Sequence, residues 1–316
     1  MQIQKHPAEK EINKLVRIWE KSVKATHDFL KSGDIAFYRP FVEEFIHRVK
    51  IYTATEKGRT VAFMGLSDDC IEMLFVSPEK RKSGYGTELL NIAIYDEGIR
   101  KVDVNEQNTQ ALNFYLSKGF EIAGRDDTDG FGKPYPILHL QLPQAEVIET
   151  ARLRLRPFSI GDLQAFHTIC SDGQIADAGG WKRHVSEDES KGIMCGYFLN
   201  RKDVWAIELK TGGGLIGAIG FNADTRRSNP DARNLGYWLG RQHWGHGYMT
   251  EAAKAATACA YTKLGIGFVT AACFTGNHRS YRVLEKCGFI KEGVLHFSVK
   301  DENGSFRDEY IFYLPK

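Results

Sequence analysis

The stretch "RKSGYGTELL" at residues 81–90 returns, slightly altered, as "WGHGYMTEAA" at residues 244–253. Both copies place a glycine turn directly before residues that favour a helix. Glycine lets the backbone approach a ligand closely, and the first turn of a helix offers unpaired N–H groups at its positive end. Each copy is therefore a candidate phosphate site, although an ordinary helix entry with no ligand has the same pattern.

A second motif is also repeated. "NTQALNFYLSKGF" (108–120) and "NHRSYRVLEKCGF" (277–289) both begin with Asn and end with Gly-Phe. The two motifs come in the same order in both halves, and their spacing changes by no more than one loop insertion. Self-similarity of this kind indicates a duplicated plan. We expect one domain at 1–143, a linker at 144–149 and a second domain at 150–316.

The composition sets limits on the class of protein. The chain has 316 residues, 42% of them hydrophobic, and a net charge of +2. Two domains of this length can each bury a core, and the near-neutral charge argues against nucleic acid as a partner. The N-terminus lacks the apolar core of a signal peptide, and no apolar run reaches the roughly 20 residues that span a bilayer. We therefore expect a cytoplasmic protein with no membrane partner, whose six cysteines are free thiols.

Hydrophobic periodicity predicts similar elements in both halves. The first half should hold a helix from residue 12, strands at 49–56, 59–67 and 70–77, a helix at 87–95, a strand at 100–106 and a helix at 108–118. The second should hold strands at 152–158, 204–210, 215–221 and 235–240, a helix at 250–263, a strand at 268–274 and a helix at 277–287. This order predicts the α/β (α+β) class, with a mixed sheet flanked by helices in each domain.

Three other kinds of site fit the sequence poorly. Neither glycine loop ends in the Gly-Lys-Ser/Thr of a P-loop. "GGGLIG" (212–217) has the spacing of a dinucleotide fingerprint, but it lies between two β-like runs and is better explained as a hairpin turn. His243 and His246 have no cysteine or carboxylate partner at a useful spacing, so we expect no metal.

The order of motifs resembles the GNAT family of acetyl-CoA-dependent N-acetyltransferases, once in each half. This order is a strand, R-x-x-G-x-G, a helix and a strand, followed by N-x(6)-Y-x(3)-G-F. The first half is similar to the YjaB type of peptidyl-lysine acetyltransferase through "SVKATHDFL" (22–30), "VNEQN" (104–108) and "GKPYPILHL" (132–140). The second half is similar to the RimJ/RimL-like branch, which acetylates ribosomal proteins, through "TARLRLRPF" (150–158), "GYWL" (236–239) and "WGHGYMTEA" (244–252).

The resemblance implies an acetyl-CoA site in the first half. The cofactor-binding residues would be Leu74, Phe75, Val76, Arg81, Lys82, Ser83, Gly84, Tyr85, Gly86, Thr87, Asn105 and Asn108. Tyr115 would give a proton to the departing thiolate, and Glu72 could draw one from the amine. His27 and Asp28 would line the amine side. Ordinary structural roles stay open for four of these residues: helix capping for Asn108 and Asp28, packing for Tyr115 and a solvent-facing strand position for Glu72.

In the second half the implied cofactor-binding residues are Leu239, Trp244, Gly245, His246, Gly247, Tyr248, Met249, Thr250 and Asn277. This half departs from the pattern at several positions. Trp244 stands in the place of Arg81, Met249 in that of Gly86, and Leu284, which cannot donate a proton, in that of Tyr115. Ser280 is then the candidate catalytic hydroxyl, although it could equally belong to the capping turn. The branch often has Glu where this chain has Asn234, so the general base is open, as is the activity of this domain.

The predicted function is transfer of acetyl from acetyl-CoA to a primary amine. The acceptor would be a lysine or N-terminus of a peptide or protein. A small amine, such as an antibiotic or polyamine, is an alternative, and so is one active domain beside a CoA-binding structural module. Self-association into a homodimer is compatible with each of these.

Overall fold

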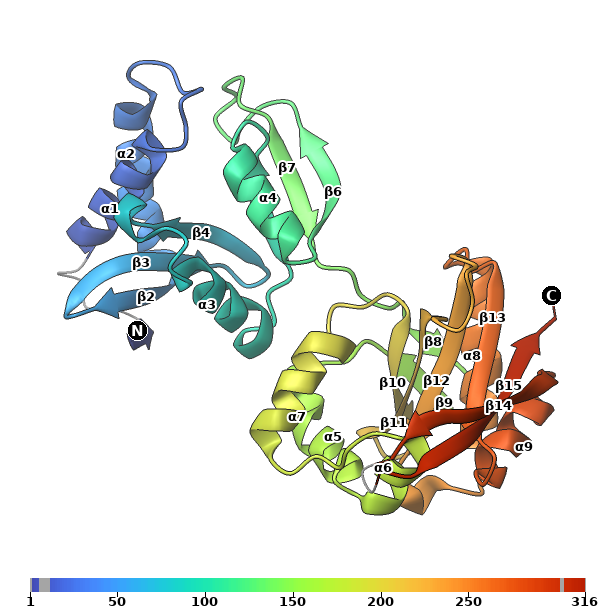
Figure 1. Cartoon of the computed structure of the whole chain (residues 1–316). Coiled ribbons are helices and arrows are strands. Elements are labelled where there is room, and N and C mark those ends of the chain that lie inside the picture. The colour runs from blue at the N-terminus through green and yellow to red at the C-terminus, as the bar shows by residue number, and fades with distance from the viewer. Residues whose placement is uncertain (1, 6–11, 302–303, 316) are drawn as a thin grey trace. The chain divides into compact units, whose positions relative to one another are not determined.

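The computed structural model describes residues 2–5, 12–301 and 304–315, and divides into two compact units, 1–143 and 144–316 (Figure 1). The segment expected as a linker, 144–149, is packed into the second unit. Ala145 lies in that unit's core, and the Trp205 indole Nε1 donates to the Glu146 carbonyl over 2.8 Å. The two last linker residues form a short strand of the second sheet.

The first unit is built on a seven-stranded sheet in the order β1-β2-β3-β4-β5-β7-β6. Its strands are β1 (Gln2–Lys5), β2 (Lys50–Glu56), β3 (Arg59–Leu66), β4 (Cys70–Val76), β5 (Lys101–Asn105), β6 (Glu121–Asp126) and β7 (Ile137–Gln141). Its helices are α1 (Ile12–Lys24), α2 (Asp34–Ile46), α3 (Tyr85–Asn91) and α4 (Thr109–Ser117), with helical turns η2 (Pro78–Lys80) and η3 (Ile92–Asp96). All neighbouring pairs are antiparallel except β4 and β5.

The helices of the first unit divide between the two faces of the sheet. Leu89 of α3 and Tyr115 of α4 share one core cluster with Val102 and Val104 of β5. Residues of α1 and α2 share another cluster with Met73 of β4. Because strand side chains alternate, Asp103, between the two valines, points to the face that carries α1 and α2.

The parallel pair β4 and β5 separates at the centre of the sheet. Its register pairs Cys70 with Lys101 and Ile71 with Val102, and in the described chain the two strands have no further partners in each other. At the same point the β3–β4 register shifts between Gly65–Met73 and Leu66–Ile71, which leaves Glu72 as the extra residue of a β-bulge. The outer half of β4 therefore has a free edge toward β5.

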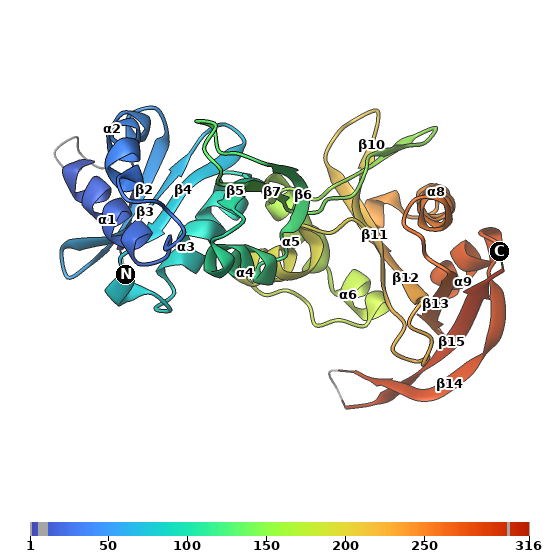
Figure 2. The same cartoon turned by 90° about the horizontal axis from the view of Figure 1, so that it is seen from above.

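The second unit repeats this plan with an eight-stranded sheet, ordered β14-β15-β13-β12-β11-β10-β9-β8 (Figure 2). Its strands are β8 (Ile148–Glu149), β9 (Leu153–Arg156), β10 (Val204–Leu209), β11 (Leu215–Ala223), β12 (Ala232–Leu239), β13 (Phe268–Phe274), β14 (Ile290–Lys300) and β15 (Phe306–Leu314). Its helices are α5 (Leu163–Cys170), α6 (Gly173–Gly179), α7 (Glu187–Ile193), α8 (Tyr248–Thr262) and α9 (His278–Lys286), with the turns η4 (Ile160–Asp162), η5 (Met194–Phe198) and η6 (Arg241–His243).

The strands β12 and β13 separate as β4 and β5 do. They are parallel and paired from Ala232–Phe268 to Leu235–Ala271, and 236–239 have no partner in β13 within the described chain. The helices α8 and α9 pack into the core on one face. The aromatic rings of Phe166 (α5) and Phe198 (η5) lie near Trp238 on the other face, with centroids 5.8 and 6.2 Å away.

Most of the expected elements are present within a few residues of their expected bounds. "GGGLIG" is the turn of the β10–β11 hairpin, with Gly213 and Gly214 at φ 66° and 80°. The expected elements do not include β1, α2, β6, β7, β8, α5, α6, α7, β14 or β15. The expectation of one mixed sheet flanked by helices in each half is confirmed.

Candidate active site

Both glycine loops have the geometry of an open helix N-terminus. Gly84 has φ 88° and precedes α3, and Gly247 has φ 78° and precedes α8; no side chain caps either helix. A positive φ of this size favours glycine. The first-turn N–H groups therefore keep the capacity to bind a phosphate, which is the feature that a CoA pyrophosphate requires.

The space in front of the first loop suits a narrow chain. A Cβ added to Gly86 would lie 3.7 Å from the ring of Phe114 on α4 and 3.7 Å from Val76 on β4. Glycine at this position therefore leaves room where the loop, α4 and the free edge of β4 meet. A cofactor with an extended pantetheine arm fits such a cradle.

Side chains of the first loop have partners that the sequence analysis did not foresee. The Arg81 guanidinium donates to the carbonyl of Ser22 at the end of α1, over 3.1 Å. The Tyr85 ring is buried, and its hydroxyl donates to Glu56 over 2.9 Å. Tyr85 can therefore reach a ligand through its backbone alone. Lys82, Ser83 and Thr87 are exposed or half-buried on the loop.

The two asparagines of the first unit are used within turns. The Asn108 side chain accepts from Ala111 N and caps α4, which is the structural role left open above. Asn105 accepts from Gln107 N over 2.9 Å. In each case the amide oxygen accepts one hydrogen bond within the turn, and the amide NH₂ group and the second lone pair of the oxygen can still contact a cofactor.

Tyr115 lies at the centre of the first unit. Its ring is 5% exposed and packs edge-on against Phe114 and Phe120, with centroids 5.2 and 5.4 Å away. Burial, and then the nearby Cys70 thiol, raises the pKa of the phenol, which therefore keeps its proton at neutral pH. No described residue hydrogen-bonds to the hydroxyl, so its proton can be offered to a ligand.

Carboxylates gather on the opposite face of the separated strands. Burial raises the pKa of Cys70 to about 12, and the next causes are the charges of Glu72, Asp103 and Asp69 around it. Glu72 is exposed in the β4 bulge and accepts from Ser67 Oγ over 2.8 Å. On the same face His139 bridges Asp103 and Asp126, at 2.8 and 3.1 Å. Lys101 pairs with Asp69 over 2.8 Å, and Asp103 and Asp126 raise the pKa of His139, so these carboxylates have cationic partners. Among the described residues Glu72 has no such partner, and it is the carboxylate that can meet a cation on this face.

His27 follows the end of α1 and lies near Arg81 of the glycine loop. Burial, and then the charge of Arg81, lowers the pKa of His27 to about 4, so the ring is neutral at pH 7. Asp28 is exposed, and the cap position of α2 is Gly33. Asp28 is therefore no helix cap, and it remains a candidate for the acceptor side.

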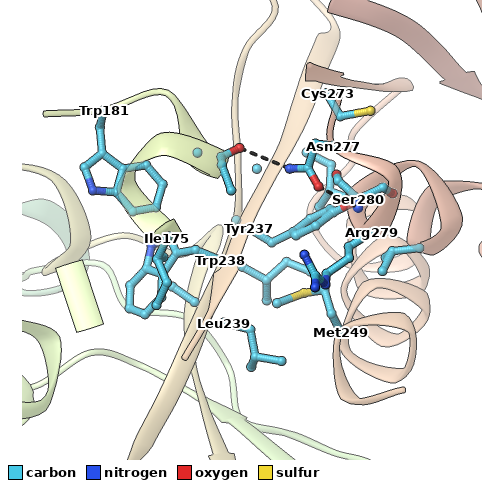
Figure 3. Close-up of a pocket in the computed structure, with 18 of the residues that line it drawn as sticks. Ile175, Trp181, Tyr237, Trp238, Leu239, Met249, Cys273, Asn277, Arg279 and Ser280 are labelled. Atoms are coloured by element: carbon cyan, nitrogen blue, oxygen red, sulfur yellow. Dashed lines mark hydrogen bonds between the residues drawn. The ribbon is translucent and has the colours of Figure 1, made fainter. Parts of the chain in front are cut away.

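A cavity of about 1060 Å³ runs through the second unit (Figure 3). One side is lined by the glycine loop and α9, including Trp244, Gly247, Asn277 and Ser280. The other side is lined by residues of the α5–α7 face, such as Phe166 and Trp181, and by Asn234 and Glu309 on the sheet. The cavity thus joins the two faces at the point where β12 and β13 separate. A donor can enter from one face and an acceptor from the other.

Two arginines from other segments lie against the second loop. Arg152 donates to the His246 carbonyl over 3.0 Å and pairs with Glu251, and Arg279 comes from α9. Trp244 replaces Arg81, its indole Nε1 donates to the Leu239 carbonyl over 2.7 Å, and the Arg279 guanidinium lies 4.7 Å from its ring centroid. Arg279 lines the cavity and so brings a positive charge to the loop. The sequence analysis missed Arg279; its position two residues after Asn277 was the available signal.

Some of the other expected residues of this loop line the cavity, and others pack against their neighbours. Leu239 and Met249 are buried in the core and also line the cavity. Gly245 has φ 81°, and His246 stacks on Tyr248 with centroids 5.5 Å apart. The Thr250 carbonyl accepts from the Cys287 thiol.

Two hydroxyl groups meet in the second cavity. Ser280 Oγ and the Tyr237 hydroxyl share a hydrogen bond of 2.8 Å, drawn in Figure 3. Asn277 caps α9 by accepting from Ser280 N, and its Nδ2 donates to the Ala178 carbonyl over 3.1 Å. Leu284 is fully buried and carries no donor, as expected. Tyr237 stands within the "GYWL" stretch but was given no role, because the proton donor was expected on the helix, at the place of Tyr115.

The acceptor face of the second unit holds a buried charge network. Asn234 contacts Thr270 at 3.5 Å, and Thr270 donates to Asp224 over 2.8 Å. Glu309, which lines the cavity, accepts from Arg226 at 3.0 and 3.1 Å. Carboxylates are therefore present on this face, although none stands at position 234.

Among the described residues no three His, Cys, Asp or Glu side chains converge as metal ligands. No helix of the described chain is long and apolar enough to cross a membrane. All six cysteines are free thiols, as expected.

Residues 47–122 and 152–290 each match a model described as an acetyltransferase (GNAT) domain. The peptidyl-lysine N-acetyltransferase YjaB of Salmonella typhimurium is 40% identical over 131 residues, which are 41% of this chain and 90% of that protein. The uncharacterized N-acetyltransferase YoaA of Bacillus subtilis is 28% identical over 174 residues, 54% of this chain and 97% of that protein. The solution structure of apo YjaB from Escherichia coli is 36% identical, covers 45% of this chain and 97% of its own, and has a TM-score of 0.42.

Proposed function

This chain belongs to the GNAT acetyltransferase family, and we propose that each of its two units holds one acetyl-CoA and acetylates an amine of a peptide or protein. The chain is an acetyl-CoA-dependent N-acetyltransferase. The observation that carries the proposal is the repeated geometry: separated parallel strands beside a left-handed glycine and an uncapped helix, once in each unit. The domain limits we propose are 1–143 and 144–316.

Acetyl-CoA supplies an acetyl thioester to either site. In the first unit the backbone of 84–87 would hold the pyrophosphate, and the free edge of 74–76 would pair with the pantetheine arm. In the second unit the backbone of 247–250 and the Arg279 guanidinium would hold the pyrophosphate. The free edge of 236–239 would pair with the pantetheine arm. Trp244, the half-buried neighbour of Arg279, closes that loop.

For the first unit the proposed acceptor is a lysine side chain. Its acceptor face presents the exposed carboxylate of Glu72, and negative charge attracts an ammonium group to a site. The peptidyl-lysine activity of the YjaB relative supports the same substrate class. Glu72, directly at the separation of the strands, would accept the proton that the amine must lose.

Tyr115 is the proposed proton donor of the first unit. The phenol is buried, stays protonated, and has no other partner among the described residues. It can therefore hold a proton at the position where negative charge develops on the leaving sulfur. The neutral ring of His27 can line the acceptor path without repelling a cation.

The proposed substrate class is tested with the full chain and acetyl-CoA. Lysine peptides, N-terminal peptides blocked at lysine, spermidine and an aminoglycoside are compared by release of the CoA thiol. The proposal expects lysine peptides to be acetylated, and Glu72→Gln to lower that activity while Glu121→Gln, on the exposed strand β6, leaves it unchanged. Turnover of the small amines alone would refute a peptide acceptor.

A further inference from the structure

We infer that in the second unit the proton donor has moved from the helix to the strand: the Tyr237 phenol, hydrogen-bonded to Ser280, does there what Tyr115 does in the first unit. This inference rests on the proposed function, because it concerns the sulfur of the CoA that the second loop would hold. It assigns a role to a strand residue that the repeated sequence motifs do not include.

The first argument is an exchange of residues between equivalent positions. Leu74 precedes the loop glycine Gly84 by ten residues, and Tyr237 precedes Gly247 by the same number. Tyr115 follows the cap residue Asn108 by seven residues, as Leu284 follows Asn277. The first unit therefore has leucine on the strand and tyrosine on the helix, and the second unit has the reverse. One phenol and one leucine are kept in each unit, so the volume at the strand–helix contact is conserved.

The second argument is that a third position changes with the other two. Ser280 follows Asn277 by three residues, and the equivalent residue of the first unit is Ala111. The hydroxyl of Ser280 is present where the strand carries tyrosine, and the two oxygen atoms lie 2.8 Å apart. An alanine suffices in the first unit, where the strand residue Leu74 has no polar atom to pair.

The third argument is the position of the hydroxyl pair. Tyr237 lies on the part of β12 that has left β13, and both Tyr237 and Ser280 line the large cavity. Figure 3 shows the Tyr237 ring directed from the strand toward α9, with Asn277 and Arg279 around its tip. The phenol thus reaches the region between the cation at the loop and the acceptor face.

The surroundings keep the pair protonated. Burial raises the pKa of the Tyr237 phenol, with the Ser280 hydrogen bond opposing part of the rise. Burial also raises the pKa of the Cys273 thiol to about 11, and Ser280 is near enough to hydrogen-bond to it. The thiols of Cys273 and Cys287 also lie near the phenol, and Glu309 across the cavity pairs with Arg226. On α9, Arg282 pairs with Glu285, while Arg279 and Lys286 line the cavity and favour added negative charge on this side.

The proton balance is then complete without another reactant. The hydroxyl pair gives one proton to the sulfur as the C–S bond breaks with its electron pair on sulfur. The pair is reprotonated by the proton that the amine nitrogen loses when the N–C bond forms. Overall, one amine and one thioester are converted into one amide and one thiol.

The test compares CoA with acetyl-CoA, which has no ionisable thiol, on the full chain carrying Gly86→Leu. A leucine at 86 fills the space beside Phe114 and Val76, so the remaining site is that of the second unit. Affinities are measured by calorimetry at about pH 6.5 and about pH 9, below and above the ordinary thiol pKa of about 8.5. If hydroxyl donors face the sulfur, they stabilise the CoA thiolate that forms at the higher pH. The affinity for CoA divided by the affinity for acetyl-CoA should then rise with pH.

Tyr237→Phe should reduce this rise by about tenfold, since a hydrogen bond to a charged group contributes about 1.5 kcal/mol or more. Tyr261→Phe, which removes a phenol bonded to the Leu314 carbonyl outside the cavity, should keep it. An undiminished rise in Tyr237→Phe would overturn the inference while leaving the proposed function intact. Loss of all CoA binding in the Gly86→Leu parent would instead refute the second site itself.

A second variant tests the exchange directly. In Tyr237→Leu the rise of the CoA to acetyl-CoA affinity ratio with pH should disappear. Adding Leu284→Tyr should restore it, because the phenol then occupies the place that Tyr115 has in the first unit. A double variant that folds and binds acetyl-CoA but shows no restored rise would overturn the equivalence of the two positions.

Discussion

Tyr115→Phe separates the chemical role of the first unit's phenol from its structural role. The ring is 5% exposed and packed between Phe114 and Phe120, and phenylalanine keeps both contacts. No described residue binds the hydroxyl, so the substitution removes no internal hydrogen bond. The free energy of unfolding should therefore change by less than about 0.5 kcal/mol.

Turnover should fall even though stability does not. General acid catalysis by one side chain typically contributes about 10²–10⁴-fold, and we expect a loss of kcat in that range with the KM for acetyl-CoA nearly unchanged. The assay is CoA thiol release with lysine peptides, on the full chain whose second loop is disrupted by Gly247→Leu. Thermal unfolding of the same samples reports stability.

The matched control is Tyr52→Phe in the same core. Tyr52 is 6% exposed, and its hydroxyl donates to Glu97, so its loss should cost about 1–2 kcal/mol and leave kcat unaltered. That cost corresponds to a fall in Tm of a few degrees, roughly 2–4 °C per kcal/mol. Wild-type kcat in Tyr115→Phe, measured where chemistry limits the rate, would remove Tyr115 from the mechanism.

Three further changes have distinct expected results. Arg279→Ala should weaken CoA binding by the second unit about tenfold and Arg279→Lys less, because the charge beside Trp244 is lost only in the first; equal affinities by calorimetry would contradict that role. Between about pH 6.5 and about pH 4 the unfolded chain binds a proton at His27 that the folded chain does not, so stability falls as the pH drops through this window. His27→Asn should reduce that acid loss by up to about 3 kcal/mol in denaturant titrations, and an identical pH profile would show that His27 is not its source. Gly84→Ala should cost about 1–2 kcal/mol through its positive φ alone, since nothing lies within 4 Å of the added Cβ; no loss in denaturant unfolding would mean that the loop relaxes freely.

The sequence predicted the central elements well because their signals are local. Alternation in "VKIYTATE" and the Lys57-Gly58 turn define the β2–β3 hairpin, and both turn residues have positive φ, 48° and 74°. The helix spacing of Leu15, Val16 and Trp19 marks α1, which buries all three. Such patterns depend on neighbours within a few residues, which a single sequence displays.

The missed elements depend on contacts far along the chain. The strand β14 is mostly exposed, its apolar residues do not alternate regularly with polar ones, and pairing with β15 defines it. In α2, Pro40 stands inside the helix and few of its residues are buried, so its periodicity is weak. The expected linker residues Ala145 and Glu146 join the second unit through its core and through a hydrogen bond from Trp205 of β10 to the Glu146 carbonyl, a contact that local sequence does not display.

The candidate site shows the same division between local and distant signals. The loop glycines and the cap residues Asn108 and Asn277 were recognisable because their roles are local. The contacts of Arg81 with Ser22, and of Tyr237 with Ser280, join segments that the chain separates widely. Positional comparison of the two helices alone therefore suggested that the second unit lacks a phenol, whereas its strand supplies one.

The number of CoA molecules bound by one chain tests the central claim most directly. Calorimetric titration of the full chain with CoA should give a stoichiometry of two, falling to one in Gly86→Leu and to one in Gly247→Leu. A stoichiometry of one that persists in Gly247→Leu and vanishes in Gly86→Leu would contradict the account, because the second glycine loop would then hold no cofactor.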